Sequence, residues 1–232
     1  MALSPLPKQN EIIYGTELMK EEIARPYLEN VTAMINTSSE MVAASQFSKR
    51  YARFVTEPAF KALTIEGRML DLSPENSILH TDFSKDKWAP EFRMLKTDGL
   101  IGGNYQEKRA ILTEQVFAGH LQPVWKLFSS ITRLPMPILW ENTAVRVFSL
   151  YEKKLRNSAS LLEIQQVNED LHYLVYEAPG ALFGEKNNPF RLFHRKLQEN
   201  KEGEWIRERK TCCFNYAVNN CGSYCAACPK KP

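Results

Sequence analysis

The sequence predicts an α+β protein that is predominantly helical, in which a helical bundle is followed by a C-terminal β-hairpin and a cysteine-rich loop. Apolar residues recur at helical spacing through the middle of the chain. Two charged and aromatic runs then flank a short turn that contains Gly203. All five cysteines of the chain lie in the 17 residues from Cys212 to Cys228. Together these features predict helices first, then a hairpin, then a site built from thiols.

Length and composition are those of an ordinary globular protein. The chain has 232 residues, of which 44% are hydrophobic and 25% charged. This is enough for one large domain or two small ones. We expect a helical and mixed region over residues 1–104 and a second helical region over residues 105–232, an arrangement that also fits one continuous domain. The net charge of +3 is too small to indicate nucleic-acid binding by itself.

Hydropathy argues against a membrane-spanning segment. The longest apolar runs are about seven residues, whereas roughly 20 are needed to cross a bilayer. The N-terminus lacks the basic start and apolar core of a secretory signal. We therefore expect a cytoplasmic protein without a transmembrane segment, which leaves room for peripheral membrane association. Because stable disulfides are rare in a reducing compartment, the cysteines are better interpreted as metal ligands than as covalent cross-links.

The first half mixes helices with short strands. Residues 1–15 are expected to be an extended lead-in. A helix should begin near Thr16 as its N-cap, and Pro26 should kink or split it. The further elements expected are two helices, a turn, two short strands and a glycine-rich turn, over residues 39–54, 58–69, 71–76, 78–83, 92–96 and 99–104 in that order.

The second half shows the clearest helical pattern. Apolar residues step by four and three positions over residues 117–131 and again over residues 144–155, which is one face of a helix in each case. Pro123 interrupts the first of these helices and is expected to bend it. Ser160 and Glu163 form a capping box for a third helix, which should run to about residue 173.

The hairpin connects this bundle to the cysteines. A loop over residues 178–188 is followed by two expected β arms, residues 190–197 and 204–211. The second arm leads directly into Cys212. Residues 191–210 carry seven Lys or Arg against four Glu. This excess of positive charge fits a docking surface for an acidic electron donor or an anionic ferric complex. It fits a solvated hairpin face equally well.

The spacing of the cysteines indicates a metal centre. Cys225 and Cys228 form a Cys-x-x-Cys pair, whose short loop places two thiolates on one metal. Cys212 and Cys213 are adjacent, and neighbouring side chains of a strand point to opposite faces. Because two irons offer ligand positions in different directions, adjacent thiolates favour a [2Fe–2S] cluster over a single tetrahedral zinc. A structural zinc site is the alternative, and Cys221 is either a spare cysteine or a substitute ligand.

The sequence lacks the motifs of several other kinds of functional site. Cys221, Cys225 and Cys228 have the spacing of the radical S-adenosylmethionine triad, but that triad precedes a large barrel and only four residues follow here. No G-x-G-x-x-G follows a strand, so we expect no nicotinamide or flavin site and a separate protein as electron donor. The four histidines form no HExxH pattern, and we expect surface or hydrogen-bonded core roles for them. Aromatic platforms and repeated finger spacing, which would indicate nucleic acid, are missing.

Three motifs together resemble the FhuF-type ferric-siderophore reductases. Their C-terminal signature is Cys-Cys, about ten residues, then Cys-x-x-Cys, and this chain has eleven residues between its two pairs. Residues 138–143 (ILWENT) resemble the aliphatic-Trp-x-Asn element of that family, and Asn188-Pro189 resembles its Asn-Pro loop. The resemblance covers about residues 120–232. The gap is one residue longer than usual and contains Cys221, so Cys221 could replace one cysteine of the adjacent pair.

The resemblance implies a ferric-siderophore reductase. It implies a [2Fe–2S] cluster whose ligands are Cys212, Cys213, Cys225 and Cys228, and one-electron reduction of chelated Fe(III) to Fe(II) in the cytoplasm. The implied partners are a ferric siderophore as substrate and a ferredoxin or flavoprotein reductase as electron donor, without nucleic acid. The alternative is a zinc-binding structural or interaction domain without redox activity.

Trp140 and Asn142 match the family's Trp-x-Asn element and have two interpretations. In the first, Trp140 anchors the core and Asn142 caps the helix that follows. In the second, both contact the substrate.

Overall fold

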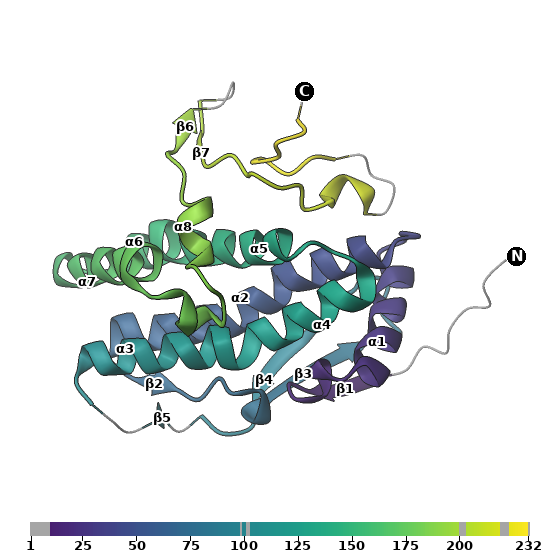
Figure 1. Cartoon of the computed structure of the whole chain (residues 1–232), viewed down its shortest axis with the longest axis horizontal. Coiled ribbons are helices and arrows are strands. Elements are labelled where there is room, and N and C mark those ends of the chain that lie inside the picture. Colours follow the sequence, from purple (N-terminus) through teal and green to yellow (C-terminus); the bar gives the residue numbers. More distant parts are fainter. Residues whose placement is uncertain (1–9, 98, 101–102, 200–202, 219–222, 232) are drawn as a thin grey trace, which may run out of the picture.

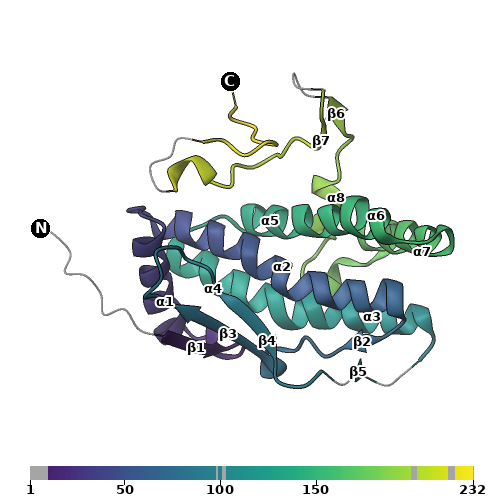
Figure 2. The same cartoon turned by 180° about the vertical axis from the view of Figure 1, so that it is seen from behind.

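Helix α2 (Glu40–Glu66) runs through the centre of the molecule and packs against α5 (Met136–Ser149), which lies alongside it. The computed structural model describes residues 10–97, 99–100, 103–199, 203–218 and 223–231. A small antiparallel sheet lies on one side of the helices and the cysteine-rich C-terminal segment lies on the other (Figures 1 and 2). The predicted fold class, predominantly helical α+β, is confirmed.

Helix α2 is a single helix, so the predicted division into residues 39–54 and 58–69 is wrong. Pro58 lies inside it. A proline in a helix interior costs about 3 kcal/mol because it removes a hydrogen bond and crowds the preceding turn. Burial of most of the helix, from Val42 to Thr64, offsets this cost. The helix ends at Gly67, whose φ of 65° forms a left-handed cap that few other residues adopt readily.

The N-terminal part combines one sheet with one helix. Strands β1 (Asn10–Tyr14), β3 (Ser77–Asp82) and β4 (Glu91–Met94) form an antiparallel sheet in the order β1-β3-β4. The two predicted short strands are thus confirmed, and the expected extended lead-in contains a third strand. Thr16 caps only a 3-10 turn (Glu17–Met19), and α1 (Glu21–Met34) begins after it. Pro26 lies within α1 without splitting it.

The next helices form a long continuous rod. Helix α3 (Tyr105–Glu114) passes through a π-helical stretch (Gln115–Leu121) into α4 (Gln122–Thr132). Pro123, the predicted interruption, lies at the start of α4. Because proline cannot donate a backbone hydrogen bond, the wider π turn in front of it accommodates the missing bond. Between α2 and α3, strands β2 (Met69–Leu70) and β5 (Gly99–Leu100) pair with each other.

Helix α5 begins at Met136, four residues before Trp140, so Trp140 lies inside the helix rather than ahead of it. A π-helical stretch (Leu150–Leu155) and the short α6 (Arg156–Ser158) follow. Helix α7 (Leu161–His172) has the predicted capping box, in which Ser160 Oγ accepts from the backbone of Glu163 and the Glu163 carboxylate accepts from the backbone of Ser160. It ends in a third π stretch (Tyr173–Glu177), and a 3-10 turn (Gly180–Phe183) lies in the predicted loop.

The predicted hairpin is present but much shorter than expected. Its strands are β6 (Gln198–Glu199) and β7 (Trp205–Ile206), each of two residues. The first predicted arm, residues 190–197, contains helix α8 (Pro189–Phe193) instead of a strand. The Asn188 side chain caps this helix by accepting from Phe190 N at 2.9 Å, and proline at the first position favours a helix start. Asparagine followed by proline was therefore a helix-start signal.

Candidate metal centre

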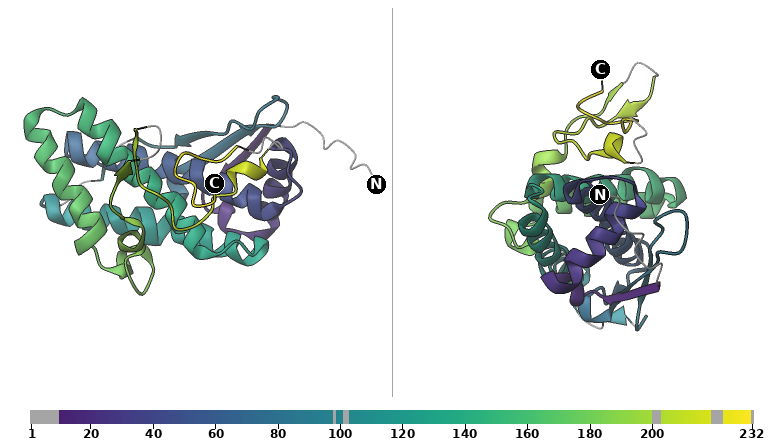
Figure 3. Two further views of the ribbon diagram at one scale, coloured as in Figure 1. Left: turned by 90° about the horizontal axis from the view of Figure 1, so that it is seen from above. Right: turned by 90° about the vertical axis from the view of Figure 1, so that its right-hand side faces the viewer.

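The C-terminal segment, residues 207–231 with residues 219–222 outside the described part, forms a separate layer across α5 and the N-terminal part of α2 (Figure 3). One backbone hydrogen bond, from Arg209 N to Ala227 O at 3.1 Å, connects the segment that precedes the first cysteine pair with the loop of the second pair. A second bond, from Cys228 N to Cys225 O at 3.0 Å, closes the Cys-x-x-Cys turn. The two cysteine pairs are thereby brought to one place.

The sulfur atoms of Cys213 and Cys225 lie 3.8 Å apart. In a tetrahedral thiolate site with metal–sulfur bonds of about 2.3 Å, two ligand sulfurs are about 3.8 Å apart. The separation therefore fits two ligands of one metal ion. The sequence expectation that Cys225 and Cys228 share one metal concerns a different pair of sulfurs and stays a prediction.

The adjacent pair Cys212 and Cys213 is followed by a sharp backbone turn. Phe214 has a φ of 56°, in the left-handed region, and its N–H donates to Cys212 Sγ at 3.4 Å. The N–H of Lys230 donates to Cys228 Sγ at 3.4 Å in the same way. Hydrogen bonds to sulfur of this kind stabilise thiolate ligands, because they are made to the charged form.

The environment of Cys213 favours its thiolate. Its hydrogen bond with Cys225, and then the positive charges of Lys49 and Arg209, lower the pKa of Cys213 to about 5 although the side chain is buried. The same hydrogen bond raises the pKa of Cys225, and burial adds to that effect. Burial also raises the pKa of Cys212. The two facing sulfurs therefore behave as one thiolate and one thiol until a metal replaces the shared proton.

A buried carboxylate on α5 holds the segment that leads into the first cysteine pair. Glu141 accepts hydrogen bonds from Lys210 N at 2.6 Å, from Thr211 N at 2.8 Å and from the Thr211 hydroxyl. The guanidinium of Arg209 lies 3.4 Å from the Glu141 carboxylate and donates to Asn142 Oδ1 at 2.7 Å. We call this network of Glu141, Asn142, Arg209, Lys210 and Thr211 the clasp; it connects α5 to the residues just before Cys212.

The clasp continues to α2 and ends at the backbone of Cys213. Asn142 Nδ2 donates to Ser45 Oγ at 3.1 Å and to Ser48 Oγ at 2.8 Å. Ser45 Oγ and Gln46 Nε2 in turn donate to Cys213 O at 2.9 and 2.7 Å. Asn142 is fully buried inside α5, so the interpretation as a helix cap is wrong, and its contacts are with protein groups that position Cys213.

Trp140, the other residue of the Trp-x-Asn element, faces away from the cysteines. Its indole donates to Glu185 Oε1 at 3.0 Å and its ring packs edge-on against Phe117 and Phe183. The interpretation of Trp140 as a core anchor is confirmed.

Two cations that the sequence analysis did not single out lie beside the cysteines. Lys49 Nζ is 3.8 Å from Cys213 Sγ and 3.2 Å from Asn215 Oδ1. Arg146 Nε donates to the backbone oxygen of Lys49 at 3.0 Å. A pocket of about 180 Å³ brings these groups together, and its lining includes Lys49, Asn142, Arg146, Arg209, Cys213 and Cys225. The sequence carried no signal for Lys49, which is 164 positions from Cys213.

The histidines take no part in this site. His120 is fully buried; its Nε2 lies 2.7 Å from the Tyr51 hydroxyl and its Nδ1 lies 2.5 Å from Leu72 O. His172 contacts Glu177, and His194 contacts Tyr176 and Glu152. The expectation of hydrogen-bonded or surface histidines holds for these three.

The donor set has the chemistry of an iron–sulfur or zinc site. Cys221, the proposed substitute ligand, lies outside the described residues. Within the described ranges, no three His, Cys, Asp or Glu side chains converge on a point that could hold a metal ion. The four remaining thiols nevertheless fit thiolate ligation, because one sulfur–sulfur distance matches a shared metal and two sulfurs accept backbone hydrogen bonds. The assignment of Cys212, Cys213, Cys225 and Cys228 as ligands stays a prediction.

A helical scaffold that presents paired thiols beside buried cations thus defines a candidate thiolate metal centre. A family model described as ferric iron reductase FhuF-like transporter matches residues 45–204, more than half of the chain. The chain therefore belongs to the FhuF-like ferric iron reductase family. The match begins in α2 and ends before Cys212, whereas the sequence motifs placed the resemblance at about residues 120–232. No curated protein matches the sequence.

In the described part of the chain, no helix combines the length and the apolar character needed to cross a bilayer.

Proposed function

We propose that this protein is a cytoplasmic ferric-siderophore reductase in which Cys212, Cys213, Cys225 and Cys228 hold a [2Fe–2S] cluster. Family membership supports a reductase role with a ferric substrate. The single observation that carries the proposed metal centre is the 3.8 Å separation of the Cys213 and Cys225 sulfurs, which matches two thiolates on one tetrahedral metal.

The adjacent cysteines support two irons rather than one zinc. Cys213 faces Cys225 at 3.8 Å, and Cys212 interacts electrostatically with both Cys228 and Cys213. Because a binuclear cluster offers ligand positions in two directions, it accommodates neighbouring thiolates more readily than a single zinc, which would gather all four at one point.

The chemistry that a [2Fe–2S] cluster supplies is the transfer of single electrons. In the proposed reaction one electron passes to chelated Fe(III), which becomes Fe(II), and a separate ferredoxin or flavoprotein reductase restores that electron. Hard oxygen donors hold Fe(III) far more tightly than Fe(II), so reduction releases the iron without breaking the chelator. The clasp residues Glu141, Asn142 and Arg209 position the thiols, and Lys49 places a positive charge beside them.

The test is the colour and metal content of protein purified without oxygen. We expect a reddish-brown protein with visible charge-transfer bands that bleach on addition of dithionite, and two irons and two sulfides per chain. A colourless protein that contains one equivalent of zinc would establish the alternative, a zinc-binding structural or interaction domain without redox activity.

The substrate class is tested separately. Dithionite-reduced protein, freed of excess reductant, is mixed with a panel of ferric siderophores while the visible spectrum is followed. We expect the bands of the oxidised cluster to return as Fe(II) appears, one Fe(II) for each cluster oxidised. A coloured protein that no ferric siderophore reoxidises would contradict the siderophore assignment while leaving the cluster intact.

A further inference from the structure

Two pockets border the cysteine segment and share part of their walls. One, of about 200 Å³, lies between α5 and β7; the other is the pocket of about 180 Å³ beside Cys213. Val145 of α5 and Ala227 of the Cys-x-x-Cys loop line both of them. We call the two together the cysteine-side groove. A molecule in this groove would touch the loop between Cys225 and Cys228 and would therefore lie beside the candidate metal centre.

One end of the groove carries a cation without a carboxylate partner. Among the described residues, no Asp or Glu oxygen lies within 4.0 Å of Arg146. The neighbouring arginines are paired: Arg209 with Glu141 and Arg207 with Glu152. Burial lowers the pKa of Arg146, as do the positive charges of nearby arginines. An anion in the groove would relieve both effects, because it would restore the favourable interactions that burial removes.

The other end of the groove has an apolar surface that is partly exposed. Phe148, Leu197, Trp205 and Ile206 form this surface, and Trp205 is 62% exposed. The charged residues Glu152, Lys153 and Arg207 line the same end. An exposed tryptophan beside a pocket is typical of binding surfaces, because the ring offers a large rigid contact area. The groove therefore offers a cation at one end and an aromatic surface at the other, with the cysteine loop between them.

From these features we propose that the cysteine-side groove binds the ferric substrate, and that Arg146 selects anionic ferric chelates by pairing with their carboxylate oxygens. The planar guanidinium presents parallel N–H donors that match a carboxylate. This inference rests on the proposed reductase function, since it assigns the substrate site of that reaction.

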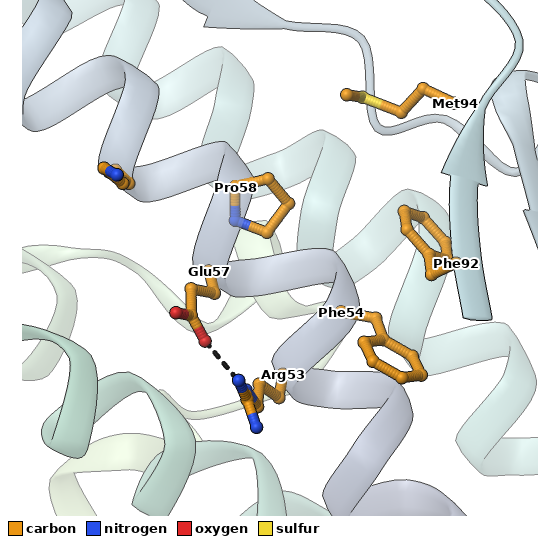
Figure 4. A pocket seen from close by; sticks show the side chains of 7 residues that line it. Arg53, Phe54, Glu57, Pro58, Phe92 and Met94 are labelled. Atoms are coloured by element: carbon orange, nitrogen blue, oxygen red, sulfur yellow. Dashed lines mark hydrogen bonds and ion pairs between the residues drawn. The ribbon is translucent and has the colours of Figure 1, made fainter. Parts of the chain in front are cut away.

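A third pocket, between α2 and β4, lies away from the cysteine segment (Figure 4). Arg53 and Glu57 line it and pair with each other at 2.9 Å, and Glu57 also pairs with Lys154 at 2.7 Å. Lys61 is the other charged residue that lines it. No residue of the cysteine segment lines it, so it supplies a control position, Lys61, for the experiment.

The experiment measures binding of redox-inactive gallium(III) chelates by calorimetry to the full chain, purified without oxygen. Gallium(III) citrate is the anionic probe, gallium(III) tris(acetohydroxamate) is the neutral probe, and free citrate controls for simple anion binding. The variants are Arg146→Gln, Arg146→Lys, which keeps the charge, and Lys61→Gln, which removes a distant charge from α2. The visible spectrum of each variant reports whether the metal centre is unchanged.

Loss of a charge-assisted hydrogen bond should weaken gallium(III) citrate binding about 10-fold or more in Arg146→Gln. We expect Arg146→Lys, which keeps the charge but lacks the parallel N–H donors, to weaken binding less than Arg146→Gln does. We expect Lys61→Gln to bind like the wild type, and the neutral probe to be unaffected. The inference is overturned if Arg146→Gln binds gallium(III) citrate as tightly as the wild type, if it loses both probes equally, or if free citrate binds as tightly as its gallium complex. Because gallium accepts no electron, these results are independent of whether the protein reduces iron.

Discussion

Cys213 is the most firmly positioned residue of the candidate metal centre. Its backbone oxygen accepts hydrogen bonds from Ser45 and Gln46, and its sulfur lies 3.8 Å from both Cys225 Sγ and Lys49 Nζ. It is also buried, with 1% of its surface exposed. Because contacts hold both the backbone and the side chain of this residue, its thiol needs little rearrangement to become a ligand.

The ligand assignment makes a direct prediction. Cys225→Ser and Cys228→Ser should each lose the visible bands and most of the bound iron, because serine is a poor ligand for iron in such clusters. Cys221→Ser should keep both. Iron analysis and visible spectra of anaerobically purified variants measure the effect. Loss of iron in Cys221→Ser together with its retention in Cys212→Ser would show that Cys221 is the ligand.

Lys49 makes a prediction about reduction potential. Reduction would add a negative charge to the proposed cluster, and a cation 3.8 Å from the sulfur of Cys213, a proposed ligand, would stabilise that charge. Lys49→Met should therefore lower the midpoint potential, whereas Lys49→Arg should change it less. Spectroelectrochemical titration measures the potential, and Lys61→Gln serves as the control for loss of a lysine charge. An unchanged potential in a fully loaded Lys49→Met protein would rule out this role.

At the scale of elements, α2 and α5 together form the platform on which the cysteine segment rests. The residues of the Trp-x-Asn element make contacts on two sides of α5. Trp140 packs into the core and Asn142 connects Arg209 to Ser45 and Ser48 on α2. Glu141 faces the segment that leads into Cys212. In this element, Glu141 and Asn142 thus hold the cysteine segment, whereas Trp140 anchors the core.

Breaking the clasp should affect both stability and metal content. Glu141→Gln leaves Arg209 without its buried partner, and loss of one member of such a pair costs about 3–5 kcal/mol. We expect this loss in urea unfolding, together with reduced iron content. Ser160→Ala, which removes the cap of α7, should cost about 1 kcal/mol and leave the iron content unchanged. Equal iron loss in the two variants would mean that iron content only follows global stability.

At the scale of the whole molecule, one continuous hydrophobic core includes residues from both predicted regions. Phe47 and Tyr51 of α2 stack on each other, and Phe47 also contacts Phe128 of α4. Phe60 near the end of α2 stacks on Phe117. Helix α2 therefore connects the sheet side to the later helices, and the predicted boundary at residue 104 stays a prediction.

The buried His120 predicts how stability depends on pH. Burial lowers its pKa from 6.5 to about 4 in the folded protein. Between these values the unfolded chain binds a proton that the folded protein does not, so stability should fall by roughly 3 kcal/mol as the pH drops from 6.5 to 4. Above pH 6.5 this group contributes no slope.

Urea unfolding of the wild type and of His120→Gln at pH 7 and pH 5 measures this contribution. Glutamine can form hydrogen bonds with both Tyr51 and Leu72 but does not titrate. The variant should therefore lose less stability than the wild type between the two pH values. Equal losses in the two proteins would exclude His120 as the titrating group.

The sequence by itself determined the features that depend on neighbouring residues. The helical stripes, the Ser160 capping box and the two short strands follow from local spacing, and the thiol chemistry follows from cysteine positions within 17 residues. Because members of a family share such short motifs, the sequence alone was enough to show the resemblance to the ferric iron reductases.

Only the tertiary structure decided the features that depend on packing. Pro58 remains inside an unbroken α2 because that helix is buried along most of its length. Lys49 lies beside Cys213, and Asn142 beside Arg209, because α2 and α5 pack side by side beneath the cysteine segment. Contacts between residues so far apart in the chain leave no local pattern, so no spacing rule could have predicted the clasp or the cation at the cysteines.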